Sequence, residues 1–176
     1  MKKYNTQMIV IAGALIALHV VLSRFCSINA WNLKIGFAIV PIFIAAYFYG
    51  PVYAGIVGAL GDFLGAILFP IGAYFPGFTM TCFLTGVLLG LLLHKKRNIP
   101  RILCAVLINE LILSLLVNTL WISILYGSPF VPLLATRIVQ CGIMVPVEVV
   151  VLCALSRLLI PLKKEIVLYE SSRRDF

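Results

Sequence analysis

Long apolar segments, separated by short polar or basic loops, fill almost the whole sequence and leave few ways for the chain to fold. Hydrophobic residues make up 62% of the 176 positions and charged residues only 11%, whereas soluble domains carry about 25% charged residues. A soluble core cannot bury this much apolar surface. A helix crosses a bilayer with about 20 apolar residues, so the sequence predicts an all-α membrane protein.

Six transmembrane helices are expected, all within a single integral membrane domain over residues 1–176. Their predicted positions are roughly Gln7–Phe25, Ile35–Tyr49, Val52–Phe69, Phe78–Leu93, Ile102–Leu125 and Val131–Ile160. The second span is short and is interrupted by Pro41. An even number of spans places both termini on one side, together with the basic loop Lys95–Arg101. By the positive-inside rule that side is cytoplasmic, which predicts a multi-pass protein of the cell membrane.

Composition and motifs argue against several other classes of protein. The net charge of +8 comes mainly from loops and chain ends, a pattern typical of cytoplasmic loops and not of nucleic-acid binding. The five cysteines are scattered and form no CxxC pair, so neither a disulfide framework nor a zinc site is indicated. No P-loop, H-E-x-x-H or G-x-S-x-G motif occurs. We therefore expect a protein that is not an enzyme and that uses no cofactor or metal ion.

One acidic residue, Asp62, stands within an apolar segment long enough to cross the membrane. On a helix, the small residues of this segment share one arc with Asp62, and the large apolar residues occupy the opposite arc. The small residues are Ala54, Gly55, Gly58, Ala59, Gly61, Gly65 and Ala66. The large arc suits lipid or bulky neighbours, whereas the small arc lets other backbones come close to a carboxylate.

Ionisable side chains inside a bilayer cost roughly 2.5–3.5 kcal/mol each on insertion scales, so each is a candidate functional residue. In the expected topology, Asp62 and Arg137 lie at the same depth, near the outer surface. Other residues of that layer are Arg24, Asn118, Trp121 and Gln140. This convergence predicts a polar ligand site that opens outward and is closed by loops containing Trp31, Tyr74 and Phe75. The alternative is an Asp62–Arg137 ion pair that only joins two helices.

Two carboxyl groups lie deeper, Glu110 in the fifth span and Glu148 in the sixth. They suit either a proton or ion relay or a role in helix packing and in support of the site. His19, in the first span, is expected to be a packed, hydrogen-bonded core residue. The first span also carries small residues that permit close packing, either inside the bundle or against another membrane subunit. These are Ala12, Gly13, Ala14 and Ala17.

The segment Gly50–Gly86, with its runs GDFLGAILFP and GAYFPGFT, resembles the substrate-binding S components of energy-coupling factor (ECF) vitamin transporters. The folate-specific members are the most similar. The resemblance extends over the whole chain through its six spans, its cytoplasmic termini and the small residues of the first span. Pantothenate and riboflavin relatives share much of the central pattern.

The resemblance implies a high-affinity folate-binding subunit of an ECF-type ABC importer, which captures its ligand from outside. It also implies docking through Ala12–Ala17 on a membrane coupling subunit. Two ATPase subunits would then drive toppling of the S component and release of the vitamin inside. The loops Cys26–Lys34 and Phe69–Gly77 would gate the site.

For folate, the depth and chemistry of the candidate residues suggest a role for each group. The pterin ring is expected beside acidic and amide groups and against aromatic rings, and the glutamate tail beside basic groups. The acidic and amide groups beside the pterin ring are Asp62 and Asn118. The aromatic rings are those of Trp31, Phe75 or Trp121, and the basic groups beside the glutamate tail are Arg24, Lys34 or Arg137. Two alternatives remain. One is an S component for riboflavin or pantothenate, and the other is an autonomous proton-coupled carrier that uses Glu110 and Glu148.

Overall fold

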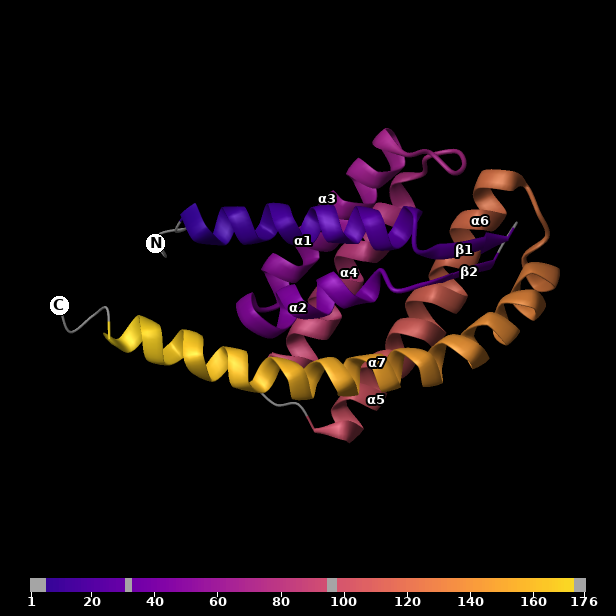
Figure 1. Ribbon diagram of the computed structural model, residues 1–176. Coiled ribbons are helices and arrows are strands. Elements are labelled where there is room, and N and C mark those ends of the chain that lie inside the picture. Colours follow the sequence, from indigo (N-terminus) through magenta and orange to yellow (C-terminus); the bar gives the residue numbers. More distant parts are fainter. Residues whose placement is uncertain (1–5, 31–32, 95–97, 173–176) are drawn as a thin grey trace.

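The computed structural model describes residues 6–30, 33–94 and 98–172, which form a bundle of helices with one short β-hairpin (Figure 1). The helices are α1 (Thr6–Arg24), α2 (Ile39–Tyr49), α3 (Pro51–Leu68), α4 (Pro76–Leu93), α5 (Ile99–Ile108), η1 (Asn109–Val117), α6 (Asn118–Tyr126) and α7 (Phe130–Ser172). η1 is a π-helix that continues α5 into α6. The strands β1 (Ser27–Ala30) and β2 (Leu33–Gly36) pair antiparallel.

Within the part of the chain that the structure describes, five helical segments are long and apolar enough to cross a membrane, so the prediction of a helical membrane protein is confirmed. They are Thr6–Arg24, Pro51–Leu68, Pro76–Leu93, Ile99–Tyr126 and Phe130–Leu159. The remaining predicted span, Ile35–Tyr49, corresponds to α2, which has 11 residues. It is therefore about 16 Å long, roughly half the hydrocarbon thickness of a bilayer. Phe43, Ala46 and Tyr47 of α2 are fully buried, so this short helix lies inside the bundle.

The connection between α1 and α2 corrects one prediction. The sequence predicts a polar loop over Cys26–Lys34 and a helix from Ile35, but these residues contribute to β1 and β2, in a register that pairs Ser27 with Gly36. A side chain on Gly36 would place its Cβ 2.8 Å from that of Ser27, so glycine permits this close pairing. Strand pairing also satisfies backbone N–H and C=O groups that would otherwise lack partners beside the membrane core.

The last helix, α7, is longer than predicted. It continues beyond Ile160 to Ser172 and contains Pro146 and Pro161. Proline removes one backbone hydrogen bond and bends a helix without always ending it. In Figure 1, α7 accordingly curves along one side of the bundle.

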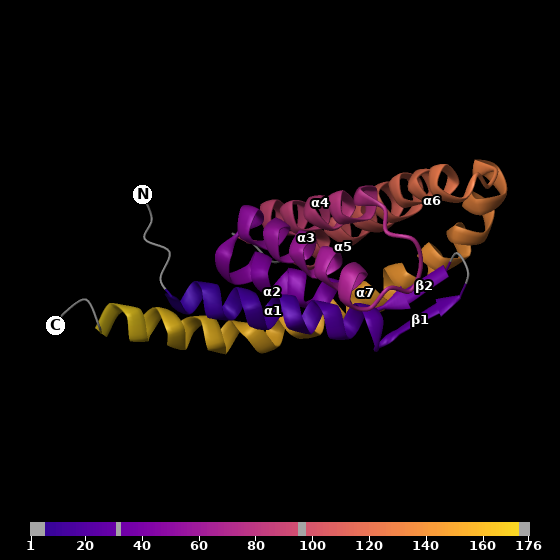
Figure 2. The same cartoon turned by 90° about the horizontal axis from the view of Figure 1, so that it is seen from above.

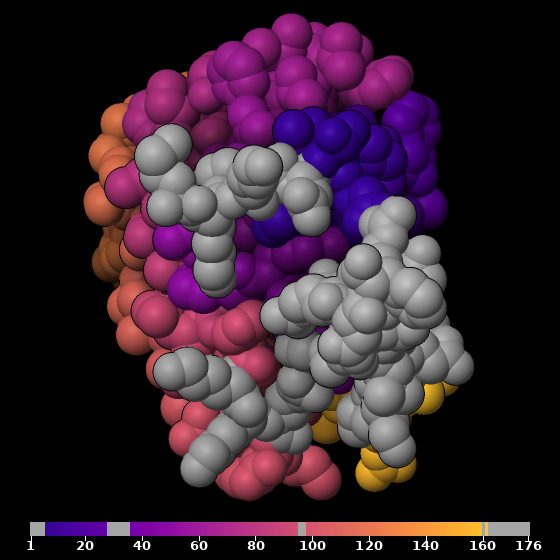
Figure 3. All heavy atoms as spheres, turned by 90° about the vertical axis from the view of Figure 1, so that its left-hand side faces the viewer, coloured from indigo at the N-terminus to yellow at the C-terminus, as the bar shows by residue number. Residues whose placement is uncertain are grey.

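The start of α1, the junction of α4 with α5, and the end of α7 lie at the same end of the bundle (Figures 1 and 2). Figure 3 looks onto this end, where the indigo, pink and yellow parts of the chain all appear. The β-hairpin, the connection from α3 to α4 and the turn from α6 to α7 lie at the opposite end. This is the arrangement that the predicted topology requires.

Glycines bring α3 close to its neighbours. A Cβ on Gly86 or Gly90 of α4 would lie 2.4 or 2.2 Å from backbone atoms of α3, and one on Gly61 would lie 2.6 Å from the His19 ring. His19 is packed as predicted, since it is 2% exposed and its Nδ1 donates to the carbonyl of Ala38 at 3.1 Å. The small arc of α3 thus faces α1 and α4. On its large arc, side chains such as Ile67, 57% exposed, point out of the bundle.

Candidate functional site

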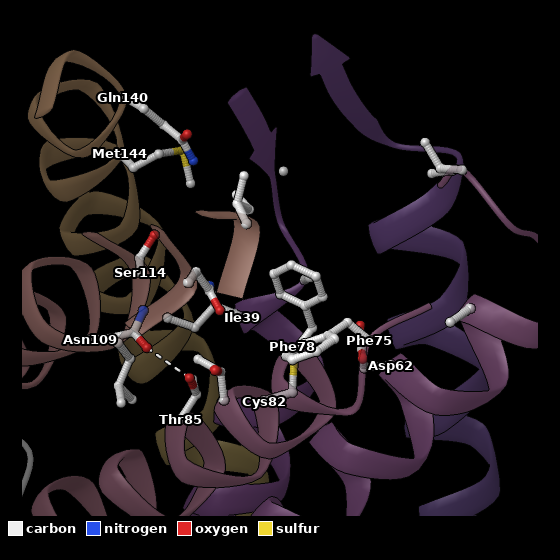
Figure 4. A pocket seen from close by; sticks show the side chains of 18 of the residues that line it. Ile39, Asp62, Phe75, Phe78, Cys82, Thr85, Asn109, Ser114, Gln140 and Met144 are labelled. Carbon is white, nitrogen blue, oxygen red and sulfur yellow. Dashed lines mark hydrogen bonds between the residues drawn. The ribbon is translucent and has the colours of Figure 1, made fainter. Parts of the chain in front are cut away.

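A cavity of about 370 Å³ lies between the helices and is lined by α1, the end of β2, α2, α3, α4, η1, α6, α7 and the connection from α3 to α4. Cavities of this size hold small organic ligands. Seven of the predicted ligand-binding residues line it: Arg24, Asp62, Tyr74, Phe75, Asn118, Arg137 and Gln140. Figure 4 shows its wall, with Asp62, Phe75 and Phe78 on one side and Asn109, Ser114, Gln140 and Met144 on the other.

At the end of the cavity near the α3–α4 connection, polar groups bind one another. Asp62 Oδ1 lies 3.8 Å from Arg24 Nη2, and both side chains are nearly buried. Asp62 Oδ2 accepts a hydrogen bond from the Thr79 hydroxyl at 2.9 Å, and the Tyr74 hydroxyl lies 3.3 Å from that of Thr79. A side chain on Gly65 of α3 would place its Cβ 3.0 Å from Arg24 Nε, so the glycine leaves space for the guanidinium group of Arg24. The predicted alternative of an Asp62–Arg137 pair is wrong, because among the described residues Asp62 forms its ion pair with Arg24.

Aromatic rings gather beside this outer end. Phe75 packs against Trp121 and Phe78, with ring centroids 5.5 and 6.1 Å apart, and Tyr74 packs edge-on against Phe63 at 5.8 Å. The indole Nε1 of Trp121 donates to the Thr81 hydroxyl at 3.2 Å. Phe75 lines the cavity and Trp121 supports it from outside the lining, so a flat ligand would meet Phe75 first.

Arg137, Gln140 and Asn118 also line the cavity. Arg137 is 5% exposed, and its Nη2 donates to the Ser114 carbonyl on η1 at 3.1 Å. This bond joins α7 to the π-helical segment. Asn118 follows η1 directly, and its buried Oδ1 has no hydrogen-bond partner among the residues described.

The inner end of the cavity is acidic and contains groups that the sequence did not assign to the ligand site. Thr85 donates to Asn109 Oδ1 at 2.9 Å, and Asn109 Nδ2 donates to Glu110 Oε1 at 3.3 Å. Glu110 and Glu148 are 4% and 5% exposed, and both line the cavity. The sequence signal for them is their ionisable character in the middle of a span.

The π-helix η1 supplies a large share of this wall. Residues on the cavity side of η1 and α6 recur about every four positions: Asn109 and Glu110, Leu113 and Ser114, Asn118, Ile122 and Tyr126. π-Helical turns are rare and frequently occur at functional sites. The predicted span Ile102–Leu125 is confirmed as one continuous helical segment over Ile99–Tyr126, but the sequence does not indicate its π-helical part.

Two predicted ligand residues belong to the hairpin region. Trp31 lies outside the described residues. Lys34 lies on β2, opposite Asn29 in the strand pairing. A role of either side chain in ligand binding therefore stays a prediction. Among the described residues, no group of three or more His, Cys, Asp or Glu side chains is placed to hold a metal ion.

The small residues of α1 are turned away from the cavity. Gly13, Ala14 and Ala17 are exposed, Ala12 is half-buried, and no described atom lies within 4 Å of a Cβ built on Gly13. Internal packing therefore does not explain Gly13, Ala14 and Ala17, and the alternative of a docking face stays a prediction.

These features define a class of protein: an α-helical membrane protein with a polar, ligand-sized cavity enclosed by its helices. A family model described as "ECF transporter, substrate-specific component" matches residues 7–156. The chain belongs to this family of multi-pass membrane transport proteins, and the resemblance seen in the sequence is confirmed.

Relatives and solved structures point the same way. The chain is 39% identical over 153 residues to the "Folate transporter FolT" of Clostridium novyi (strain NT), covering 86% of this chain and 88% of the relative. It is 30% identical over 154 residues to the "Folate transporter FolT" of Leuconostoc mesenteroides subsp. mesenteroides, covering 84% and 83%. A crystal structure of FolT bound with folic acid matches with a TM-score of 0.82 and 34% identity, over 86% of this chain and 93% of that one. The S component of a bacterial ECF transporter shares the fold with a TM-score of 0.50 at 22% identity, over 93% and 96%.

Proposed function

We propose that this protein is the folate-specific S component of an ECF vitamin importer in the cell membrane. The observation that carries the proposal is the close match to a FolT structure with folic acid bound, at a TM-score of 0.82. Both relatives described above are named as folate transporters. The protein binds its vitamin without changing it chemically, so its activity is capture and delivery and not catalysis.

The chemistry of the cavity supports a ligand of this kind. Folic acid has a flat heterocycle with N–H donors at one end and two carboxylates at the other. The cavity offers aromatic rings at Phe75 and Phe78, carboxyl and amide acceptors, and the guanidinium groups of Arg24 and Arg137. Carboxylates accept paired N–H groups, and arginines bind carboxylates.

Delivery requires partners. As in the family, the S component docks on a membrane coupling subunit that carries two ATPase subunits, and toppling driven by ATP releases the vitamin inside. The exposed small residues Gly13, Ala14 and Ala17 on α1 give a surface that another helix can approach closely. Connections at the opposite end, including Tyr74 and Phe75, close the cavity while the ligand is held.

A panel of vitamins tests the proposal. We expect the purified full chain to bind folic acid with 1:1 stoichiometry in isothermal titration calorimetry, and to bind riboflavin and pantothenate at least about 100-fold more weakly, a difference of about 2.8 kcal/mol. Tight binding of riboflavin or pantothenate without folate would instead favour an S component for that vitamin. Folate transport by the reconstituted chain without an ATPase partner would favour an autonomous carrier.

A further inference from the structure

The inner end of the cavity contains acceptor atoms that the protein leaves unused. Glu110 Oε2 and Glu148 Oε2 are buried and have no hydrogen-bond partner among the residues described. Both side chains line the cavity. A buried carboxyl oxygen without a hydrogen-bond donor is costly, so these two atoms indicate that a bound group donates to them.

The surroundings satisfy these carboxyl groups only in part, although Ser114 lies within hydrogen-bonding reach of Glu110 and Asn109 within reach of Glu148. Asn109 donates to the other oxygen of Glu110 at 3.3 Å, and Cys141 donates to the backbone carbonyl of Glu110. Arg137 is near enough to Glu110 to interact with its charge, but its Nη2 donates to the carbonyl of Ser114. Two carboxyl groups thus face one end of the cavity, and one oxygen of each has no donor among the described residues.

The outer end has the opposite character. Both oxygens of Asp62 already have partners, in Arg24 and Thr79. Arg24 Nε, by contrast, is a buried donor without a partner among the described residues. The outer end therefore offers a hydrogen-bond donor and the inner end offers acceptors. Between them, Figure 4 shows the apolar side chains of Ile39, Phe78 and Cys82, which suit a flat ring.

We propose that Glu110 and Glu148 form the subsite that binds the 2-amino and N3–H donors of the pterin ring. Folate then enters with its heterocycle inward, and its glutamate carboxylates remain near Arg24. This inference rests on the proposed function and deepens it. It also reverses the residue roles expected from the sequence, which placed the pterin ring beside Asp62. The adjacent N–H groups of the ring match the acceptor geometry of a carboxylate, and a carbonyl or carboxylate group of the ligand would be repelled there.

Chemical double-mutant cycles test this assignment, with Glu110→Gln and Glu148→Gln titrated against folic acid and against a folate analogue that lacks the 2-amino group and is methylated at N3, so that both ring donors are absent. We expect at least one variant to lose about 10-fold or more in affinity for folic acid, as a charged hydrogen bond allows. The same variant should lose less than about 3-fold for the analogue, because the donor is already absent. Glu165→Gln is the matched control, since Glu165 lies in the last part of α7, beyond Leu159, where the membrane-spanning segment ends.

Each other outcome counts against the inference. Equal losses for both ligands would show that the carboxyl groups act only on the fold, and no loss in either variant would show that the ring binds elsewhere. Glu110→Asp, which keeps the acceptor, provides a second variant if Glu110→Gln does not fold. Failure of the unaltered protein to bind folic acid would overturn the proposed function itself, and this inference with it.

Discussion

Both ends of the cavity contain buried or nearly buried charged side chains, but the carboxyl groups at the two ends differ in how many of their oxygen atoms have partners within the protein. At the outer end, Arg24, Asp62, Thr79 and Tyr74 form a continuous chain of contacts. At the inner end, Glu110 and Glu148 keep buried oxygen atoms without partners among the described residues. The carboxylate at the outer end is therefore satisfied by contacts within the protein itself, as a closing element requires, and only Arg24 Nε is left there as a donor for a ligand. The inner end is completed only when a ligand supplies donors, as a recognition subsite requires.

The largest expected effect comes from removing both inner acceptors together. Glu110→Gln combined with Glu148→Gln should weaken folate binding by about 100-fold or more, since charged hydrogen bonds contribute about 1.5–3 kcal/mol each and about 1.4 kcal/mol equals tenfold in affinity. Titration calorimetry measures the change, with Glu165→Gln as the control. A loss of folate affinity of less than about 3-fold would show that the inner end is not the recognition subsite.

The next effect in size concerns the unused donor at the outer end. Arg24→Gln should weaken folate binding by about 10-fold, because it removes a charged donor that a ligand carboxylate can use. Pteroic acid, which lacks the glutamate, should bind the variant and the unaltered protein alike. Equal losses for folic acid and pteroic acid would place the glutamate tail away from Arg24.

A smaller effect is expected from the contacts that close the outer end. Thr79→Val breaks the connection between Tyr74 and Asp62 and should raise the folate dissociation rate by about 2- to 10-fold, the range for a neutral hydrogen bond of about 0.5–1.5 kcal/mol. Stopped-flow tryptophan fluorescence can follow release, because Trp121 packs against Phe75. Thr136→Val, on α7 and outside the cavity lining, is the control. An unchanged rate would show that this chain of contacts does not close the site.

The smallest effect on binding is expected on the far side of α1. Ala14→Leu should leave folate affinity unchanged, because Ala14 is exposed and does not line the cavity. It should nevertheless reduce ATP-dependent folate uptake in proteoliposomes with the coupling module, because a larger side chain prevents close helix approach. Ala154→Leu, an exposed alanine on α7, is the matched control. Full uptake by the Ala14 variant would exclude this face as the docking surface.

Much of this arrangement could be predicted from the sequence, because a bilayer makes polar residues conspicuous. The cost of burying Asp62, Arg24 and Arg137 in lipid is enough to mark them as functional candidates from the sequence alone. The small arc of α3 likewise predicts close helix contacts, and Gly61 and Gly65 indeed lie against His19 and Arg24 of α1.

The pairing of these residues could not be predicted in the same way. Depth alone places Arg24 and Arg137 equally near Asp62, and only the approach of α1 to the glycines of α3 decides for Arg24. The inner subsite could not be predicted either, because it depends on the π-helical turn at Glu110 and on which oxygens already have donors. Neither property has a local sequence signature, since both arise from tertiary packing.

A structure of the protein with folic acid bound tests the central claim most directly. We predict the amino-pyrimidinone edge within about 3 Å of Glu110 or Glu148, the usual range for a hydrogen bond, with the ring beside Ile39, Phe78 and Cys82 and the glutamate carboxylates near Arg24. A ligand with its heterocycle at Asp62 and its carboxylates turned toward Glu110, or a ligand bound outside the cavity, would contradict the account.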